Sequence, residues 1–469
     1  MNLSVLIGML ATVALILGLS IFSGTRMRGA SQENGAAVTA GLIMGTLVGG
    51  SSTVGTAQLA YNYGMSAWWF TLGGGISCLV LALCFVGPLR HNGGRTLIGM
   101  IEGEFGPAAG LAASILNTVG TFINVISQMI AASAVLAVLF PSLSLQWELI
   151  ATTLFMIFYV VIGGRRGAGM VGILKLALLY VAMIGSGVLV LRFTGGVGGF
   201  RAMVDTIDNP DGVNFYSLFA RGAGTDLGAG LSLLLGVLTT QTYAQAVLSA
   251  KSDGAARTGA LASTFLIPPI GVGGILVGLY MRASFPGIAA KTALTAFVTQ
   301  YMPGVLGGVV LGALFIAVVG TGAGLALGMS FVLNEDILDR FTHRFDGPAR
   351  QKLMGRVWMV LVLALACVLS MGSLGDTILS FAFMSMGFRA AAVFASLCAA
   401  LFFPGRVDRR FALVSIIAGP AAVMAGKFMG LPFDSLFLGI AVGLVVIALG
   451  AAAQAMKTRR SNARISQRL

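Results

Sequence analysis

The segment GLIMGTLVGGSSTVGTAQLAYNYG, from Gly41 to Gly64, decides how this chain folds. It is apolar and long enough to cross a bilayer, but Gly49-Gly50-Ser51-Ser52-Thr53 interrupts its middle. Within lipid, an unsatisfied backbone amide or carbonyl costs several kcal/mol, so a broken helix persists only where protein or a water-filled cavity surrounds it. The segment therefore predicts a discontinuous helix beside a cavity, as in many secondary transporters. The alternative is a glycine-rich face that packs against a neighbouring helix.

The composition places the rest of the chain in a membrane as well. Of 469 residues, 57% are hydrophobic and only 10% are charged, which is too little polar surface for a soluble globule. All four cysteines lie in apolar runs, so neither a disulfide framework nor a spaced zinc site is expected. We expect an all-α polytopic protein with about 13 transmembrane helices, near residues 3–23, 38–63, 66–88, 107–140, 146–163, 169–192, 226–249, 259–281, 304–333, 354–372, 376–403, 411–428 and 434–456.

The net charge of +13 reports topology rather than a nucleic-acid partner. Alternate loops and the tail hold 21 of the 29 Lys and Arg residues, the other loops hold 6, and Lys175 and Arg389 lie inside spans. With an odd number of spans, the positive-inside rule predicts an external amino terminus and a cytoplasmic carboxyl tail. The first run has no small-x-small cleavage site before Arg26, so we expect a retained helix in the cell membrane, inner or plasma.

The spans divide into two halves that enter the membrane from opposite sides. Five spans in each half predict a 5+5 inverted repeat with binding at the interface of the halves. The expected units are a leading helix and loop (1–36), a first repeat (37–192), an external loop (193–225), a second repeat (226–403), and two trailing helices with the basic tail (404–469).

The symmetry partner of the broken helix is 226–249, where Thr239 to Gln245 are mostly polar. A second break is therefore expected there, facing the first across a cavity. Five residues are predicted to line this cavity as substrate-binding residues: Ser52, Gln58, Asn124, Gln241 and Tyr243.

Several segments occur in a characteristic order after a leading extra helix. They are VGTAQLAYNYGMSAWW (Val54–Trp69), YVVIGGRRG (Tyr159–Gly167), QTYAQAVLSAKSDGAAR (Gln241–Arg257) and AVVGTGAGLALGMSFVLNEDIL (Ala317–Leu338). Together they resemble the sodium:solute symporter family, which has the inverted-repeat fold of the bacterial leucine transporter. The resemblance covers nearly the whole chain. It implies transport of a small organic solute by alternating access, with the lipid bilayer as surroundings and no obligatory protein partner.

The resemblance also implies a cation site between the broken helix and the ninth span. A sodium ion would take carbonyls at Gly45 and Val48 and partners at Ala317, Gly320 and Thr321. Gly320 has no hydroxyl, so the metal site, if sodium binds, reduces to Gly45, Val48, Ala317 and Thr321. The positions of a further sodium in some members fall on Gly172, Ala323 and Gly324, which carry no side-chain ligand. A hard cation needs several oxygen ligands, and most of the family's side-chain oxygens are missing here. No cofactor is therefore expected, and a sodium ion is the alternative.

Lys175 lies one helical turn after Gly172, on the same face, and is expected to look toward the emptied sodium position. An intramembrane charge costs at least ~2.5–3.5 kcal/mol and marks a functional candidate. In some amino-acid transporters of this fold, a lysine of the corresponding helix places its ammonium where sodium otherwise binds. Lys175 is therefore predicted to replace sodium and to carry protons. The alternative is that it snorkels to the cytoplasmic interface, only ~10 Å away.

Arg389 lies near the middle of the eleventh span, and none of the sixteen acids is expected deep in a span. A buried guanidinium without an acidic partner needs carbonyls, water or an anionic ligand to stabilise its charge. We therefore expect an anionic, carboxylate-like substrate that contacts Arg389. The alternative is that Arg389 caps carbonyls of a broken helix.

Asn117, Thr121, Asn124 and Gln128 form one polar stripe on the fourth span, with spacing i, i+4, i+7 and i+11. The resemblance places this helix along the substrate path, and interhelical hydrogen bonding is the alternative.

The predicted function is a secondary transporter of a small anionic organic solute, either sodium-independent or proton-coupled through Lys175. A sodium-coupled symporter with the reduced site is the first alternative, and a transporter-derived sensor or a channel is the second. An enzyme is disfavoured because His91 and His343 lie in loops and the spans hold no acid pair or metal-ligand cluster.

Overall fold

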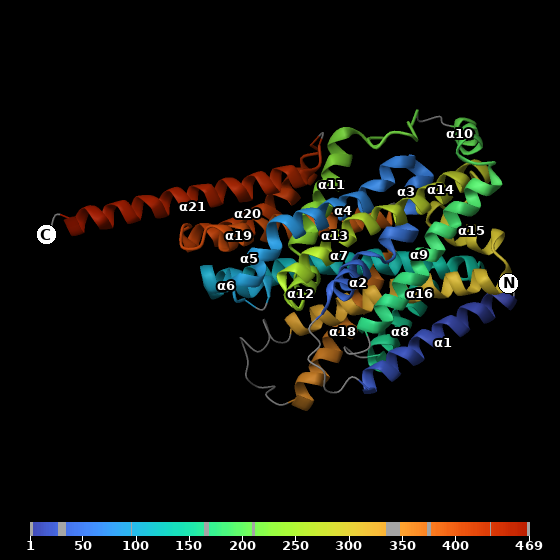
Figure 1. Ribbon diagram of the computed structural model, residues 1–469, viewed down its shortest axis with the longest axis horizontal. Coiled ribbons are helices and arrows are strands. Elements are labelled where there is room, and N and C mark those ends of the chain that lie inside the picture. Colours follow the sequence, from blue (N-terminus) through green and yellow to red (C-terminus); the bar gives the residue numbers. More distant parts are fainter. Residues whose placement is uncertain are drawn as a thin grey trace.

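The computed structural model describes residues 3–26, 34–94, 96–163, 168–208, 212–333, 348–372, 377–431 and 433–466. Over these ranges the regular secondary structure is helical, apart from a single bridge between Asn34 and Ala250. The predicted all-α fold is confirmed. The helices form an elongated bundle with the two chain ends at opposite ends of its long axis (Figure 1).

The first half of the bundle contains the leading helix α1 and then the helix that is broken as predicted. Its elements are α1 (Leu3–Arg26), α2 (Ala36–Leu47), the π-helix η1 (Ser51–Gly55), α3 (Thr56–Tyr63), the 3-10 turn η2 (Gly64–Trp68), α4 (Trp69–Val80), the π-helix η3 (Leu81–Phe85), α5 (Val86–His91), α6 (Leu97–Phe105), α7 (Pro107–Leu139), α8 (Leu145–Gly163) and α9 (Ala168–Phe193).

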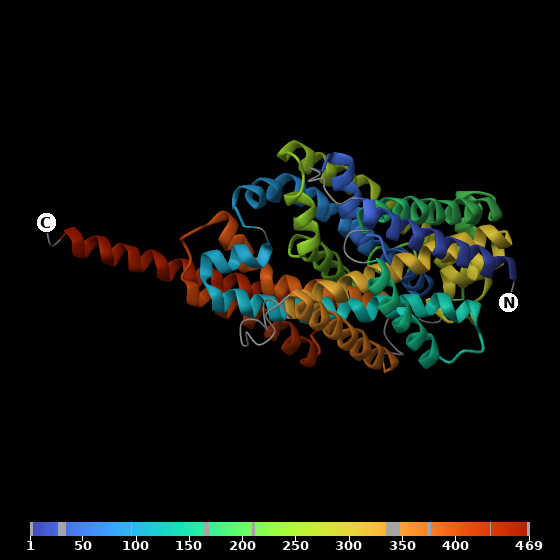
Figure 2. The same cartoon turned by 90° about the horizontal axis from the view of Figure 1, so that it is seen from below.

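The second half follows a connecting segment that holds the short helix α10 (Val197–Asp205). It contains α11 (Ala223–Leu238), α12 (Gln241–Leu248), α13 (Asp253–Leu266), α14 (Pro268–Ser284), η4 (Ala290–Thr292), α15 (Ala293–Tyr301), α16 (Gly304–Phe331), α18 (Pro348–Met371) and α19 (Ile378–Phe402). The trailing helices are α20 (Arg409–Phe428) and α21 (Ser435–Ser466), and α21 projects beyond the bundle (Figure 2).

Fewer than the expected thirteen helices of the described residues meet a length and apolarity criterion for a membrane span. In the part of the chain that the structure describes, nine helices are long and apolar enough to cross a membrane, or ten if the bent pair α11–α12 is one span. Three further apolar stretches are shorter where the structure describes side chains, Leu3–Gly18 of α1, Ala36–Leu47 and Leu145–Tyr159 of α8. Of these, α2 (Ala36–Leu47) is a short helix because the backbone breaks after Leu47.

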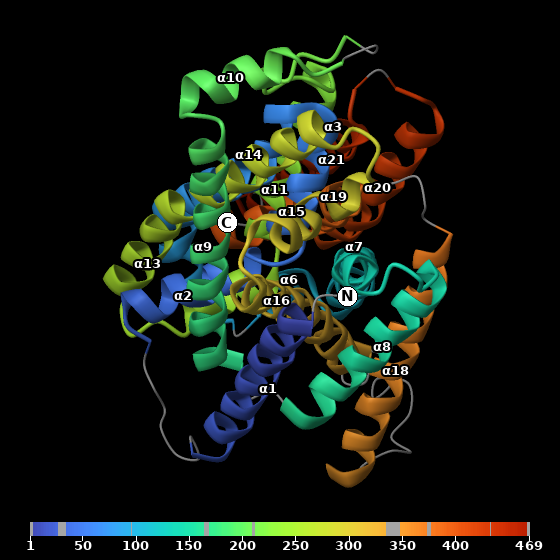
Figure 3. The same cartoon turned by 90° about the vertical axis from the view of Figure 1, so that its right-hand side faces the viewer.

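Glycines let the leading helix lie directly on the backbone of α16. A Cβ on Gly8 would stand 2.5 Å from the carbonyl oxygen of Val305, and one on Gly308 would stand 2.2 Å from that of Val5. Close approach of this kind is how membrane helices gain van der Waals contact without a hydrophobic driving force. Seen along the bundle (Figure 3), α1 therefore lies at the outer edge of α16, while α7, α16 and α19 form the centre.

Candidate solute and cation site

The first break lies at Val48 to Gly50. Helix α2 ends at Leu47, Val48 is extended (φ −83°, ψ 97°), and the chain re-enters helical structure through η1. A Cβ on Gly50 would stand 2.6 Å from Ala131 Cβ and 2.9 Å from Gln128 Oε1, so only glycine fits against α7. The predicted unwinding of this span is confirmed.

Side chains satisfy the backbone groups that the break releases. The Gly49 amide donates to Ser52 Oγ (3.0 Å), and the Gly50 amide donates to Gln128 Oε1 (3.1 Å). The Gly49 carbonyl accepts from Ser52 Oγ (3.1 Å) and from Thr53 Oγ1 (2.7 Å). Lipid offers no such partners, so these hydroxyls and the amide of Gln128 make the break tolerable inside a membrane. Ser52 is thus a backbone partner at the break, and a contact with substrate stays a prediction.

The polar stripe of α7 begins at this break. Gln128 Nε2 donates to Ser51 Oγ (3.2 Å) and to Asn124 Oδ1 (3.3 Å). Further along the stripe, Thr121 donates to the Asn117 carbonyl (2.8 Å), while Asn117 Oδ1 is buried with no hydrogen-bond partner among the described residues. Gln128 therefore makes the interhelical hydrogen bonds that were the alternative to a contact with substrate. The side-chain oxygen of Asn117 can still accept a hydrogen bond from another group.

Gln58 lies on α3 and joins the broken helix to α19. Its Oε1 accepts a hydrogen bond from the Ile378 amide (2.9 Å), and Ser127 Oγ of α7 donates to the Ile378 carbonyl (2.8 Å). These bonds cap the start of α19 and connect it to α3 and α7.

The second break lies at Thr239-Thr240, where α11 and α12 meet at an angle of 46°. Thr240 Oγ1 donates to the Gly236 carbonyl (2.5 Å), which replaces part of the lost helical bonding. Tyr243 is 1% exposed, and its hydroxyl has no partner among the described residues. Gln241 accepts from the Leu97 amide (2.8 Å) and so caps the start of α6. The predicted second break is confirmed.

Arg389 of α19 is 2% exposed and points into the second break. Its Nη1 donates to Thr240 Oγ1 (2.9 Å), its Nε to the Ser385 carbonyl (3.2 Å), and its Nη2 to the sulfur of Met386 (3.0 Å). Among the ion pairs of the described residues, none joins Arg389 to an acid. The guanidinium thus reaches a hydroxyl of the break rather than its carbonyls.

Gly120 of α7 makes room for Arg389, and sequence reasoning missed it. A Cβ there would stand 2.4 Å from Arg389 Cγ, and the Gly120 carbonyl accepts from Ser385 Oγ (2.6 Å). Gly120 lies one turn from Asn117 and Asn124, so α7 runs past both breaks with its polar face. The spacing of a glycine within the polar stripe is the signal that would have found it.

The residues predicted to hold a cation lie where α16 faces the first break. A Cβ on Gly49 would stand 3.1 Å from Thr321 Oγ1, and Thr321 itself donates to the Ala317 carbonyl (2.8 Å). Beside Gly320, the Tyr159 hydroxyl of α8 lies 3.2 Å from where a Cβ would be, so it fills the space of the missing side chain. Gly45 lies in α2.

Sodium, as a hard cation, prefers several oxygen ligands, and its binding at these residues stays a prediction. Thr321 is the single side-chain hydroxyl of the predicted set, and it already donates to one of the carbonyls in that set. Lys175 lies on α9, and its side chain falls outside the described residues.

An ionic cluster lies at the start of α11, at the end of the bundle that holds α10. Arg221 Nη2 and Asp226 Oδ1 are 2.6 Å apart, and Ser66 Oγ donates to the same oxygen (2.7 Å). Nearby, burial raises the pKa of the Asp434 carboxyl, while Arg221 and Lys427 act in the opposite direction. Asp226 is fully buried, so its pairing with Arg221 is what makes an acid acceptable there.

At the opposite end, Arg90 of α5 holds the last turn of α12. Its Nη1 donates to the carbonyls of Val247 (2.9 Å) and Ala250 (2.7 Å), and its Nε pairs with Asp253 (2.7 Å). The chain before α2 joins in, because Asn34 exchanges backbone bonds with Ser249 (3.2 Å) and Lys251 (2.9 Å). A cation at a helix carboxyl end is electrostatically favoured. We call these contacts of Arg90 and Asn34 the Arg90 clamp.

Replacing Arg90 with glutamine is expected to open this end of the bundle. Charged hydrogen bonds contribute about 1.5–3 kcal/mol, so their loss shifts the equilibrium between the clamped and the open form of this end roughly tenfold or more toward the open form. A cysteine introduced at Ser249, in a background with Cys84→Ser, should then react faster with a water-soluble thiol reagent. Arg409→Gln, which changes an exposed arginine at the start of α20, should leave the labelling rate unchanged. Equal rates in wild type and Arg90→Gln would contradict the clamp.

Two broken helices, a buried polar cluster at each and a surrounding shell of apolar helices define a multi-pass membrane transporter. The chain belongs to the sodium:solute symporter family, which matches residues 28–419. An uncharacterized symporter of Bacillus subtilis (strain 168), YwcA, is 24% identical over 393 residues, covering 79% of this chain and 75% of the relative. A sodium/glucose cotransporter of Vibrio parahaemolyticus is 21% identical over 430 residues, covering 84% and 78%.

Solved structures confirm the predicted fold. A Na⁺-coupled sialic acid symporter in a substrate-bound, outward-open state superimposes with a TM-score of 0.75 at 15% identity, covering 97% of this chain and 98% of that one. Mhp1, a nucleobase-cation-symport-1 family transporter in a closed conformation, gives 0.61 at 12% identity, covering 92% and 94%.

Proposed function

We propose that this protein is a secondary active transporter of a small organic anion, carboxylate-like, that moves its substrate by alternating access. The observation that carries the proposal is Arg389, a buried cation at the second break with no acidic partner among the described residues. A buried charge without a counter-charge is costly, and an anionic ligand would neutralise it. The amino-terminal end of α12 lies at the same place and adds a positive dipole end.

Substrate coordination in this proposal combines the two breaks. Arg389 and the Tyr243 hydroxyl face the anionic group, because Tyr243 is buried and its hydroxyl is free to donate. The first break offers neutral groups through Asn124 and Gln58, and Asn117 Oδ1 offers an acceptor. Gln241 contributes at the α6 end of the path. An acid also appears in the name of the sialic acid symporter, and this agrees with an anionic substrate.

Coupling in this proposal does not require sodium. Lys175 would take the position predicted for sodium, between Thr321 and the carbonyls of Gly45 and Val48, and would carry the proton that drives uptake. The thin oxygen set around Ala317, Gly320 and Thr321 supports this assignment. The amino terminus lies outside and the carboxyl tail in the cytoplasm, so the Arg90 clamp is the cytoplasmic closure.

A sodium-coupled symporter is the second candidate, and one specific observation favours it. Thr321 Oγ1 lies against Gly49 at the break, where a cation would be held, and both named relatives with a stated substrate are sodium-coupled by their names.

A thermal-shift screen of the purified protein distinguishes these candidates. We expect small carboxylates to raise the melting temperature in choline buffer, with no further rise when sodium replaces choline. Neutral sugars of similar size serve as the matched control and should leave it unchanged. Stabilisation that appears only with sodium would favour the second candidate, and stabilisation by neutral sugars alone would contradict an anionic substrate.

A further inference from the structure

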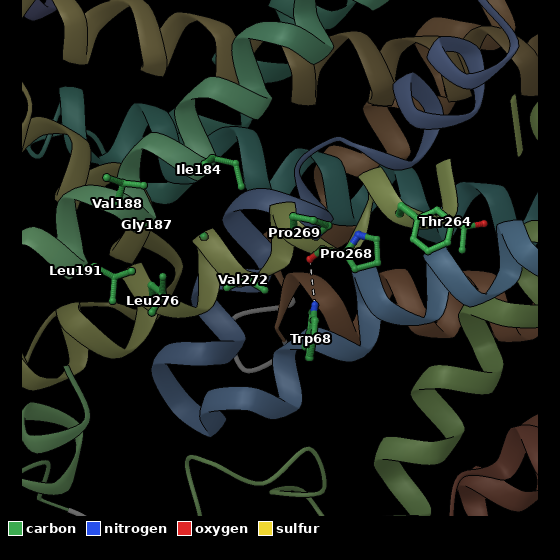
Figure 4. Close-up of a pocket in the computed structure, with 12 residues that line it drawn as sticks. Trp68, Ile184, Gly187, Val188, Leu191, Thr264, Pro268, Pro269, Val272 and Leu276 are labelled. Atoms are coloured by element: carbon green, nitrogen blue, oxygen red, sulfur yellow. Dashed lines mark hydrogen bonds between the residues drawn. The ribbon is translucent and has the colours of Figure 1, made fainter. Parts of the chain in front are cut away.

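A crevice of about 400 Å³ opens on the side of the bundle between α9, the α13–α14 junction and the turn η2. Figure 4 shows Val188, Leu191 and Leu276 at one end and Thr264 at the other, with Pro268 and Pro269 between them and Trp68 below the prolines. Its lining includes Trp68, Val188, Thr264, Phe265, Pro268 and Val272.

The crevice is apolar because its side-chain polar groups are already engaged. Trp68 Nε1 donates to the Pro268 carbonyl (3.0 Å), and Thr264 Oγ1 donates to the Ala260 carbonyl (3.2 Å). Tyr180 likewise donates to the Leu266 carbonyl (3.0 Å), which satisfies a backbone acceptor near the prolines. The other side chains are aliphatic, aromatic or proline, so a ligand must be apolar to bind there.

The crevice faces the bilayer rather than the solute path. It is formed by two segments that are long and apolar enough to cross a membrane, Leu176–Phe193 and Asp253–Ser284. Phe265 is 74% exposed and Val188 is 58% exposed, which in a membrane protein places them against hydrocarbon. An empty void would deprive its walls of dispersion contacts, so the surrounding hydrocarbon is drawn in.

We propose that this crevice binds one acyl chain of a bilayer phospholipid. The chain would lie along the α9–α14 seam, where Gly187 and Gly273 bring the two backbones together. A Cβ on Gly273 would stand 2.2 Å from the Met183 carbonyl of α9, so the two helices touch backbone to backbone and the acyl chain would lie alongside this contact rather than between the helices.

The bound chain would act on the broken helix through α14. On its other side α14 packs directly against α3, since a Cβ on Gly278 would stand 2.5 Å from the Ala57 carbonyl and one on Gly274 would stand 3.2 Å from Thr56 Cγ2. An acyl chain in the crevice would therefore pack against α14, which in turn packs against α3 directly after the first break. Uptake should in consequence depend on what fills the crevice.

Tryptophan fluorescence tests the occupant directly. A variant that keeps Trp68 alone, with Trp69, Trp147 and Trp358 changed to Phe, is reconstituted into phospholipid vesicles with or without bromine on the acyl chains. We expect bromine to quench Trp68, and Val272→Phe, which fills the crevice from α14, to restore most of the emission. Val188→Phe, which fills it from α9, should do the same if Val272→Phe folds poorly. A variant that keeps only Trp147, which is 61% exposed on α8, reports general lipid contact and should be quenched equally with and without Val272→Phe.

Trp68 emission that is insensitive to bromine would overturn the proposal, as would quenching that neither filling variant relieves. The test needs no transport substrate, so its outcome is separate from that of the proposed function.

Discussion

Arg389→Gln is expected to abolish high-affinity binding of the anionic solute and its uptake into proteoliposomes. Arg389 is buried and reaches Thr240 of the second break, and removing one member of a buried hydrogen-bonded charge pair costs about 2–5 kcal/mol, a loss of roughly 30-fold or more in affinity. Arg389→Lys keeps the charge but loses the planar fork, so an intermediate loss is expected. The measurement is a thermal-shift titration alongside radiolabelled uptake.

The stability of the unliganded protein separates this role from a structural one. An unpaired buried charge is unfavourable, so Arg389→Gln should melt no lower than wild type without ligand. If Arg389 were instead a structural cap, Arg389→Gln would lower the melting temperature of the unliganded protein. Arg201→Gln, an exposed arginine stacked on Tyr216 (5.7 Å), is the matched control and should retain both affinity and uptake. Unchanged affinity in Arg389→Gln would remove the main support for an anionic substrate.

Uptake without sodium, lost in Lys175→Met, is the second large effect that we expect. Thr321 is the one side-chain hydroxyl among the positions predicted for sodium, and Lys175 is the intramembrane cation that would stand in for the ion. Wild type should therefore take up solute with choline in place of sodium, at a rate that changes with pH because the lysine carries the proton. Lys175→Met should lose this uptake at every pH tested.

A second lysine of this protein provides the control variant for this experiment. Lys427→Met removes an exposed lysine on α20 that lies near the Met384 sulfur (3.6 Å), and it should leave uptake intact. Strict sodium dependence in wild type would refute the replacement of sodium by Lys175. A rate that is sodium-free yet independent of pH would reassign Lys175 as a fixed cation rather than a proton carrier.

Local sequence was sufficient for the architecture because both breaks are encoded where they occur. Gly49-Gly50 followed by three hydroxyl residues removes helical propensity and supplies partners within the same segment, as the bonds from Ser52 and Thr53 to Gly49 show. At the second break, Thr239 and Thr240 bond back to carbonyls of α11 three or four residues earlier. Such short-range chemistry is visible in a linear pattern, as is the apolar length of each span.

Tertiary structure alone decided which distant groups meet. Arg389 could be recognised from the sequence as a buried cation, but its contacts with Thr240 and Gly120 depend on how α19 packs against α11 and α7. That Gln241 caps the start of α6, and that Arg90 holds the last turn of α12, also follows only from the packing of these helices, while a contact of Gln241 with substrate stays a prediction. The sequence by itself determined the helices, their breaks and the family, because these follow from local composition and order. The partners of each polar side chain follow from long-range packing, which no local pattern contains.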